Sequence, residues 1–134
     1  MKQKNSILFI IATGILTYSN ALVNSFVWDD VFIVVHNDFI KGCLLLKEIF
    51  LKPLFYFAGS EFLYYRPLQS FTNMCDYYLW GLNPLGFHLT NVFLHIACAV
   101  LLYFLLTVLC KDSALSFIAV LLFVVHPLNT SVVN

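Results

Sequence analysis

The feature that most constrains this chain is an uninterrupted apolar run from Phe87 to Leu109. Its 23 residues include no Asp, Glu, Lys or Arg. As a helix the run would rise about 35 Å, which is enough to cross the hydrocarbon core of a bilayer. The rest of the chain is similar, because 61% of its 134 residues are hydrophobic and only 10% are charged. Soluble domains carry about 25% charged residues, so the sequence predicts an integral membrane protein.

Two further apolar segments predict additional crossings. The 21 residues of Ser6–Phe26 carry no charge and are long enough for a first span, although a signal peptide cleaved near Ala21 is an alternative. The run Ala114–Val125 has only 12 residues, so either a third span continues through Leu128–Val133 or the sequence stops partway through a crossing. We therefore expect an all-α integral membrane protein with about three transmembrane helices and a large outer loop. The expected boundaries are spans at about 6–26, 87–109 and 114–133, with the outer loop at 27–86.

The positions of the basic residues predict the orientation. Lys2 and Lys4 directly precede the first apolar run, and Lys111 directly follows the second. Because cytoplasmic flanks are enriched in Lys and Arg, the amino terminus and the 111–113 turn are expected to be cytoplasmic. The outer loop then lies on the extracytoplasmic face of a bacterial inner membrane or an endoplasmic reticulum membrane. The net charge is zero and no basic stripe is present, so we expect no nucleic-acid partner.

The outer loop is predicted to carry amphipathic helices that lie along the membrane interface. One candidate is Ile40–Leu51 and the other is Leu68–Trp80. In the second helix an apolar face is expected at Leu68, Phe71, Cys75 and Tyr78, and a polar face at Gln69, Asn73 and Asp76.

Two adjacent carboxylates follow the first apolar run, at Asp29 and Asp30. One of them could act as a general base, and either could ligate a divalent metal ion. Because neighbouring side chains point in different directions, we expect one carboxylate to do chemistry and the other to orient its surroundings. The alternative is a solvated loop that marks the membrane boundary.

Other polar side chains are predicted to lie near the same membrane face. Arg66 is the only arginine, and it could hold a phosphate, pair with an aspartate, or simply precede the helix that begins at Pro67. His95 is expected to have a structural role, with hydrogen bonds between helices. In the predicted orientation a group of five residues lies on or near the outer face, which predicts a site at the outer mouth of a helical bundle. The group consists of Asp29, Asp30, Arg66, His88 and His126.

Five ordered motifs resemble the amino-terminal part of a known family. They are W-D-D at 28–30, Y-Y-R-P-L at 64–68, L-W-G-L-N-P-L-G-F-H-L-T-N at 79–91, H-I-A at 95–97 and F-V-V-H-P at 123–127. This order is similar to GT-C superfamily membrane glycosyltransferases, in particular the tetratricopeptide-repeat-containing transmembrane O-mannosyltransferases. The resemblance implies a polytopic enzyme that transfers a sugar, often mannose, from a polyprenyl phosphate to an acceptor hydroxyl on the extracytoplasmic face.

The resemblance also implies roles for individual residues. Asp29 and Asp30 match the family's acidic pair, which would deprotonate the acceptor hydroxyl or bind a divalent metal ion. The implied substrate-binding residues are Tyr65, Arg66, His88 and His126. The implied partners are the lipid bilayer, a lipid-linked sugar donor and a protein acceptor with Ser or Thr hydroxyls.

The chain departs from the family at two points. Asn129 and Ser131 stand where the family's H-P-x-H-x-E motif has His and Glu. The chain also has at most three predicted spans and no 34-residue repeat. We therefore expect a partial glycosyltransferase module that is inactive by itself. The alternatives are a non-catalytic membrane subunit or degenerate remnant with an interaction role and, on weaker grounds, part of a transporter.

Overall fold

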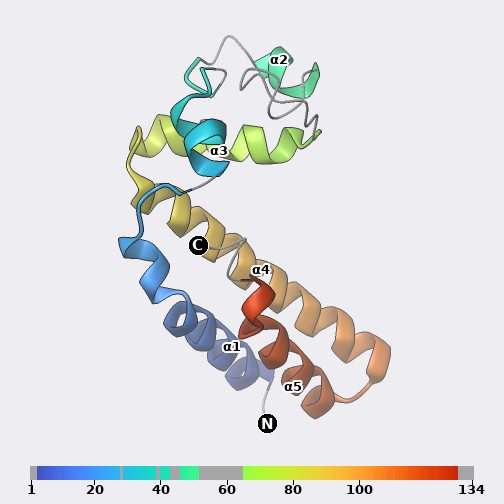
Figure 1. Cartoon of the computed structure of the whole chain (residues 1–134). Coiled ribbons are helices and arrows are strands. Elements are labelled where there is room, and N and C mark those ends of the chain that lie inside the picture. Colours follow the sequence, from blue (N-terminus) through green and yellow to red (C-terminus); the bar gives the residue numbers. More distant parts are fainter. Residues whose placement is uncertain (1–2, 28, 39, 43–45, 52–64, 130–134) are drawn as a thin grey trace. The chain divides into compact units, whose positions relative to one another are not determined.

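All regular elements of the described chain are helical, as expected for an all-α protein. The computed structural model describes residues 3–27, 29–38, 40–42, 46–51 and 65–129, and no strand occurs among them (Figure 1). The elements are α1 (Gln3–Thr17), the 3-10 helix η1 (Ser19–Val23), the π-helix η2 (Val31–Val35), α2 (Leu46–Leu51), α3 (Pro67–Trp80), α4 (Pro84–Cys110), α5 (Ser113–Val124) and the 3-10 helix η4 (Pro127–Asn129).

The chain forms two compact units, which are described separately. The helix unit comprises Met1–Asn24 and His88–Asn134. The loop unit comprises Ser25–Phe87, and the outer loop at 27–86 stays a prediction.

Helix α4 confirms the apolar helix predicted at 87–109 and is slightly longer, with 27 residues. It begins with Pro84, and the Asn83 side chain accepts a hydrogen bond from the Leu85 amide at 3.2 Å. It ends at Cys110, before Lys111 adopts a φ of +53°. Among the described helices α4 alone is long and apolar enough to cross a membrane, while α5 is apolar but has only 12 residues. The number of crossings therefore stays a prediction.

The first predicted span is not one continuous helix, and this part of the prediction is wrong. Helix α1 ends at Thr17, and after Tyr18 the chain tightens into η1. The Ser19 hydroxyl donates to the Leu16 carbonyl at 3.0 Å, and beyond η1 Asn24 is extended with ψ 150°. A local side-chain bond to the last turn thus competes with continuation of the helix.

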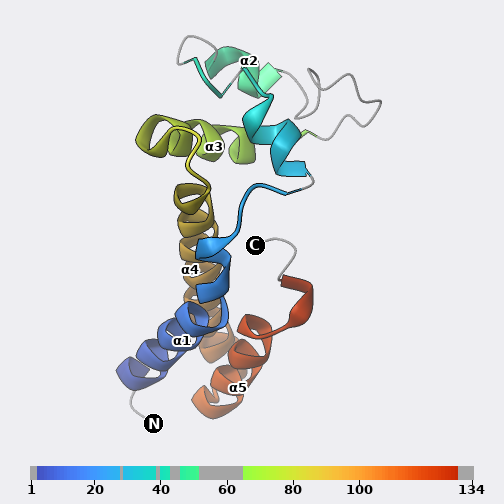
Figure 2. The same cartoon turned by 60° about the vertical axis from the view of Figure 1, so that its left-hand side comes forward.

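The core of the helix unit is shared by α1, α4 and α5, which lie side by side in both Figure 1 and Figure 2. On α1 every fourth residue is buried, at Ser6, Ile10 and Gly14. A side chain at Gly14 would place its Cβ 2.7 Å from Cγ1 of Ile96, so glycine allows α1 to approach α4 closely. The central buried cluster consists of Ile10, Ala99, Tyr103, Val120 and Val124.

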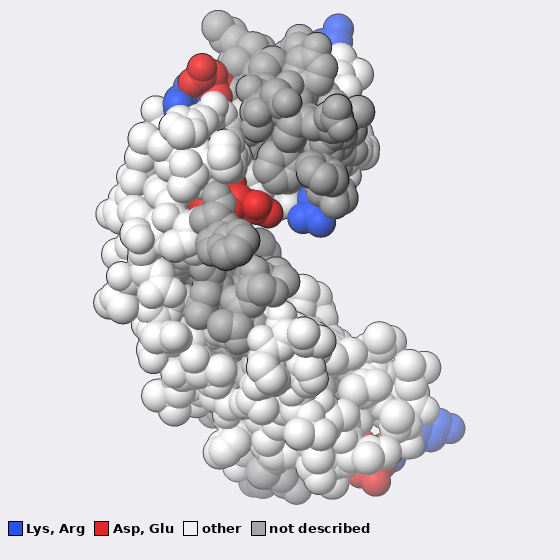
Figure 3. Space-filling view, in the orientation of Figure 1, with Lys and Arg blue, Asp and Glu red and all other residues white. Residues whose placement is uncertain are grey.

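Charged side chains of the helix unit gather at one end. Lys4 lies near the start of α1, and Lys111 and Asp112 form the turn between α4 and α5. On the face drawn in Figure 3, the coloured atoms of this unit lie at the end where α4 meets α5, and the other described atoms of the unit are white. The arrangement is typical of a membrane-spanning unit with one polar end.

The loop unit has its own apolar core. Its buried cluster is formed by Ile33, Val34, Ile40, Ile49, Met74 and Phe87. Phe26 packs edge-on against Phe87 with ring centroids 5.3 Å apart. Of the helix predicted at Ile40–Leu51, the structure describes α2, and residues 43–45 lie outside the described residues.

Helix α3 confirms the helix predicted at Leu68–Trp80, but it does not bury the predicted apolar face. Met74 lies in the core and Tyr77 packs against it, whereas Leu68 remains 72% exposed. Asp76, which the sequence placed on the polar face, is buried. The reason is that the core contacts are set by the neighbouring segments of the loop unit, not by the most apolar stripe of the helix.

Candidate active-site residues

The acidic pair lies at the start of a helical turn that leads into η2. The Asp30 amide donates to the Val27 carbonyl at 3.0 Å, and the Val27 amide donates to Oδ2 of Asp30 at 3.4 Å. In a capping box, the side chain three residues into a helix accepts a hydrogen bond from the backbone amide of the N-cap residue, and Asp30 and Val27 form this bond. Asp29 is exposed, whereas Asp30 is partly buried. The two carboxylates thus have different surroundings, and Asp30 helps to hold its own turn.

A π-helix directly follows the acidic pair. Its five residues Val31–Val35 bury Ile33 and Val34 in the core of the loop unit. The His36 amide closes the turn by donating to the Val31 carbonyl at 2.9 Å. Isolated π turns are frequent at functional sites because they change the direction of a neighbouring segment. Here η2 anchors the acidic pair to the packed part of the loop unit.

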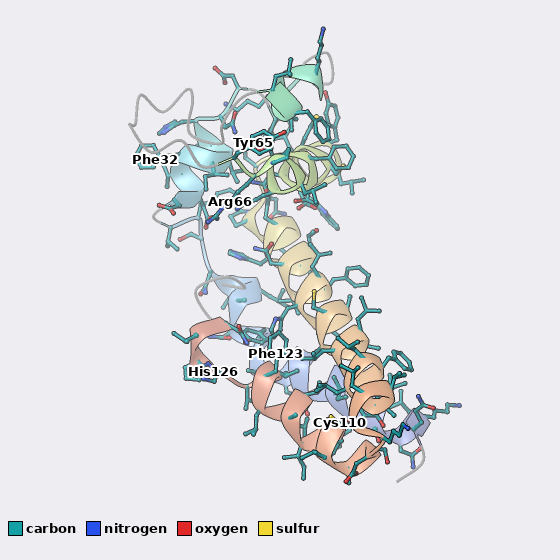
Figure 4. All side chains as sticks on the ribbon, turned by 90° about the vertical axis from the view of Figure 1, so that its right-hand side faces the viewer. Phe32, Tyr65, Arg66, Cys110, Phe123 and His126 are labelled. Atoms are coloured by element: carbon teal, nitrogen blue, oxygen red, sulfur yellow. The ribbon has the colours of Figure 1, made fainter. Side chains whose placement is uncertain are left out.

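Tyr65 and Arg66 lie just before α3, in the same unit as the acidic pair (Figure 4). The Tyr65 hydroxyl donates to the Phe50 carbonyl at 2.8 Å and so joins the start of α3 to α2. The Arg66 guanidinium is exposed, and its Nη1 donates to Oε1 of Gln69 at 3.5 Å. A guanidinium carries five N–H donors in a planar fork, which suits it to carboxylate and phosphate groups.

His88 lies in the first turns of α4 and is only 2% exposed. Neither Nδ1 nor Nε2 of its ring has a hydrogen-bond partner among the residues that the structure describes. Burying polar atoms without partners is unfavourable, so such groups in a folded protein require an explanation. His88 is therefore a candidate for contact with a group that is absent here.

His126 differs from His88 because it is exposed and engaged with its own turn. Its Nδ1 accepts a hydrogen bond from the Leu128 amide at 3.3 Å. Three residues later, Nδ2 of Asn129 donates to the Phe123 carbonyl at 2.6 Å. Figure 4 shows Phe123 and His126 at the end of α5 that lies away from Cys110. Asn129, a departure from the family motif, thus satisfies a carbonyl at the end of α5. Ser131 lies outside the described residues.

Sequence reasoning missed a contact in which Tyr18 joins three helices. The Tyr18 hydroxyl donates to the Val124 carbonyl at 3.0 Å, which connects the end of α1 to the end of α5. His95 of α4 packs between them, edge-on to Tyr18 at 5.0 Å and stacked on Phe123 at 5.2 Å. The structural position of His95 between helices agrees with the prediction, but these contacts are ring packing, and its Nε2 has no hydrogen-bond partner among the described residues. Tyr18 gave no signal in the sequence because its partner is a backbone carbonyl more than 100 residues away.

The described residues do not supply a complete metal site. No group of three or more His, Cys, Asp or Glu side chains in the described part of the chain could hold a metal ion. Asp29 and Asp30 offer oxygen ligands of the kind that Mg²⁺ and Ca²⁺ accept, but a hard cation requires more ligands than this pair provides. A role for a metal ion therefore stays a prediction.

The six predicted site residues fall into two groups. The loop unit contains Asp29, Asp30, Tyr65 and Arg66, and the helix unit contains His88 and His126. The convergence of five of them, all except Tyr65, at one outer mouth stays a prediction.

Over most of its length the chain is similar to curated membrane O-mannosyltransferase sequences, which agrees with the motifs at 28–30, 64–68 and 123–127. It is 35% identical over 123 residues, or 88% of the chain, to the human protein O-mannosyl-transferase TMTC1. It is 34% identical over 126 residues to human protein O-mannosyl-transferase TMTC3, covering 90% of the chain. The Xenopus laevis protein O-mannosyl-transferase tmtc2 is 33% identical over 127 residues, covering 92%. The resemblance inferred from the motifs is thus confirmed.

The match covers a small part of each relative. The chain spans 14% of human TMTC1, 14% of human TMTC3 and 15% of the Xenopus protein. No protein-family model matches the chain, and no solved structure matches it.

Proposed function

We propose that this chain forms the amino-terminal module of a membrane O-mannosyltransferase. The complete enzyme transfers mannose from a polyprenyl-phosphate donor to a Ser or Thr hydroxyl of a protein on the extracytoplasmic face. The observation that carries the proposal is the similarity to proteins named O-mannosyl-transferases over about nine-tenths of the chain. Because the chain spans about one-seventh of those relatives, we propose that it has no transferase activity by itself.

In the proposed reaction the Asp29 carboxylate acts as the general base. It takes the proton of the acceptor hydroxyl while the hydroxyl oxygen bonds to C1 of the sugar. The bond from C1 to the phosphate oxygen breaks, and polyprenyl phosphate leaves. Asp29 is favoured over Asp30 because it is exposed, whereas the Asp30 carboxylate is held by the Val27 amide.

Arg66 is proposed to neutralise the phosphate of the donor. Its exposed guanidinium lies in the same unit as the acidic pair and offers the planar set of donors that binds phosphate well. Tyr65 supports it by fixing the start of α3 to the Phe50 carbonyl. Substrate-binding roles for His88 and His126, which the motif resemblance implies, are part of the same proposal, and neither ring nitrogen of His88 has a hydrogen-bond partner among the described residues.

The test is a chimera in which residues of this chain replace the matching segment of human TMTC1. Transfer of mannose from polyprenyl-phosphate mannose to an acceptor protein is measured in isolated membranes. We expect Asp29→Asn to lower the rate at least about a hundredfold, which is the usual contribution of a general base. Asp38→Asn is the matched control, because Asp38 is an exposed carboxylate of the same unit that pairs only with Lys41 in the described contacts. Full activity of both the Asp29→Asn and the Asp30→Asn chimeras would overturn the mechanism.

The second candidate function is a non-catalytic membrane subunit or remnant with an interaction role. Asn129 favours it, because this side chain bonds to the end of α5 where the family has a histidine. This alternative predicts that the unsubstituted chimera inserts into the membrane yet transfers no mannose. It also predicts that Asn129→His restores nothing.

A further inference from the structure

Helix α3 carries a second apolar stripe that the core of the loop unit leaves uncovered. Met74 and Tyr77 face the core, while large side chains next to them remain exposed. The stripe follows helical spacing at Leu68, Phe71, Cys75, Tyr78 and Leu79, and Leu68 and Leu79 are 72% and 75% exposed. We call these five residues the α3 stripe.

The α3 stripe has no charged residue within it. The only residue between Pro67 and Trp80 that is charged at neutral pH is Asp76, which is buried. The charged residues of the described loop unit belong to other segments, including the exposed pair of Lys41 and Asp38. An uncharged stripe of large apolar side chains on a surface helix marks an interaction site.

Chain continuity places this stripe next to the predicted bilayer. Helix α3 ends at Trp80, and only Gly81–Asn83 separate it from α4, which bounds the connection to about 10 Å. Trp80 also packs on Gly86 in the first turn of α4, where any side chain would collide with the indole. With 27 residues α4 is about 40 Å long, so its first turn lies in the headgroup region when it spans a bilayer.

We propose that the α3 stripe lies in the boundary between lipid headgroups and acyl chains and holds the loop unit against the membrane. The favoured occupant is lipid because the stripe combines aliphatic side chains with Tyr78 and is followed by Trp80, and amphipathic aromatic rings concentrate at this depth. This inference goes beyond the proposed transferase activity, because it holds whether or not the chain takes part in catalysis.

The test uses the full chain in liposomes of zwitterionic and anionic phospholipid. The four cysteines are replaced by serine, and single cysteines are introduced for nitroxide labelling at Leu68→Cys, Phe71→Cys and Leu79→Cys. The aqueous reference is Asp38→Cys, because Asp38 is strongly exposed. The readout is the accessibility of each nitroxide to oxygen, which partitions into lipid, relative to a water-soluble nickel chelate.

We expect the ratio of oxygen to nickel accessibility to be several-fold higher at the three stripe positions than at residue 38. A ratio equal to that at residue 38 would mean a solvated stripe and would overturn the proposal. Low accessibility to both reagents would mean that protein covers the stripe, either a second copy or another segment, and would also overturn it.

A second measurement needs no change in α3. Trp28→Phe leaves Trp80 as the only tryptophan in the chain. We expect its fluorescence to be quenched more strongly by lipids brominated near the headgroup than by lipids brominated near the end of the acyl chain. Absence of quenching by either lipid would contradict an interfacial α3 even if a cysteine variant had misfolded.

Discussion

Two buried tyrosines in the helix unit differ in whether the hydroxyl has a hydrogen-bond partner. The Tyr18 hydroxyl donates to the Val124 carbonyl, whereas the Tyr103 hydroxyl is buried with no partner in the structure. The last carbonyls of a helix lack partners within that helix, so Tyr18 supplies a hydrogen bond that α5 cannot make for itself. The same chemical group is therefore stabilising at one position and unfavourable at the other.

We predict opposite effects of removing these two hydroxyls. Tyr18→Phe leaves a buried carbonyl without its donor and should lower the free energy of unfolding by about 1–3 kcal/mol. Tyr103→Phe removes an unpartnered polar group and should leave stability unchanged or raise it. Thermal unfolding of both variants in the same detergent is the measurement. A larger loss for Tyr103→Phe than for Tyr18→Phe would contradict the contacts of both residues.

At the scale of elements, the turn between α4 and α5 is defined by two residues. Lys111 takes the left-handed conformation that ends α4, and Asp112 begins α5 as its N-cap. Oδ1 of Asp112 accepts hydrogen bonds from the Ala114 amide at 2.8 Å and the Leu115 amide at 3.1 Å. Helix α5 has only 12 residues, and helices of this length are marginally stable on helix propensity alone. The hydrogen bonds of the Asp112 cap are therefore expected to contribute to the stability of α5.

We predict that Asp112→Ala destabilises the helix unit by about 1 kcal/mol, which is the usual cost of removing an N-cap side chain. Asp112→Asn is the matched control, because asparagine keeps the accepting oxygen and should retain most of the stability. The check is the thermal unfolding midpoint in detergent, followed by far-ultraviolet circular dichroism. Equal losses for alanine and asparagine would indicate that the charge of Asp112, and not its capping bonds, stabilises the turn.

Elements differ in how far the sequence determines them. Helix α4 could be predicted because a run of 23 mostly apolar residues without Asp, Glu, Lys or Arg is typical of a long apolar helix. Helix α3 could be predicted because Pro67 and Gly81 limit it to nearly the predicted residues. The end of α1 could not be predicted, because it depends on a hydrogen bond of Ser19 and on a contact between Tyr18 and α5, which is distant in the sequence. The buried face of α3 could not be predicted either, because two apolar stripes compete and the loop unit covers the one with Met74.

At the scale of the whole molecule, the candidate site is only partly determined by the sequence. Motif order located the acidic pair, Tyr65 and Arg66, and the structure places them in one unit. It could not show that Asp30 bonds to its own turn, because the bond depends on the backbone conformation at Val27. His88 and His126 belong to the other unit, so a site that includes them requires contacts that a linear pattern does not specify.

The topology of the molecule depends on whether α4 crosses the bilayer. Asp38 precedes α4 and Ser113 follows it, and both residues are exposed. In a cysteine-free chain, an impermeant maleimide added to sealed vesicles should label Asp38→Cys and Ser113→Cys from opposite sides. The basic residues Lys4 and Lys111 at the charged end of the helix unit predict that position 113 is cytoplasmic and position 38 extracytoplasmic.

The labelling result separates three arrangements, because α4 alone among the helices described between positions 38 and 113 is long and apolar enough to cross a membrane. Labelling from opposite sides in the predicted sense supports a loop unit on the face where lipid-linked sugars are used. Opposite sides in the reverse sense would keep α4 as a span but would place Asp29 in the cytoplasm, contrary to the proposed enzyme. Labelling of both positions from one side would mean that α4 does not span the bilayer, although its 27 residues include no Asp, Glu, Lys or Arg.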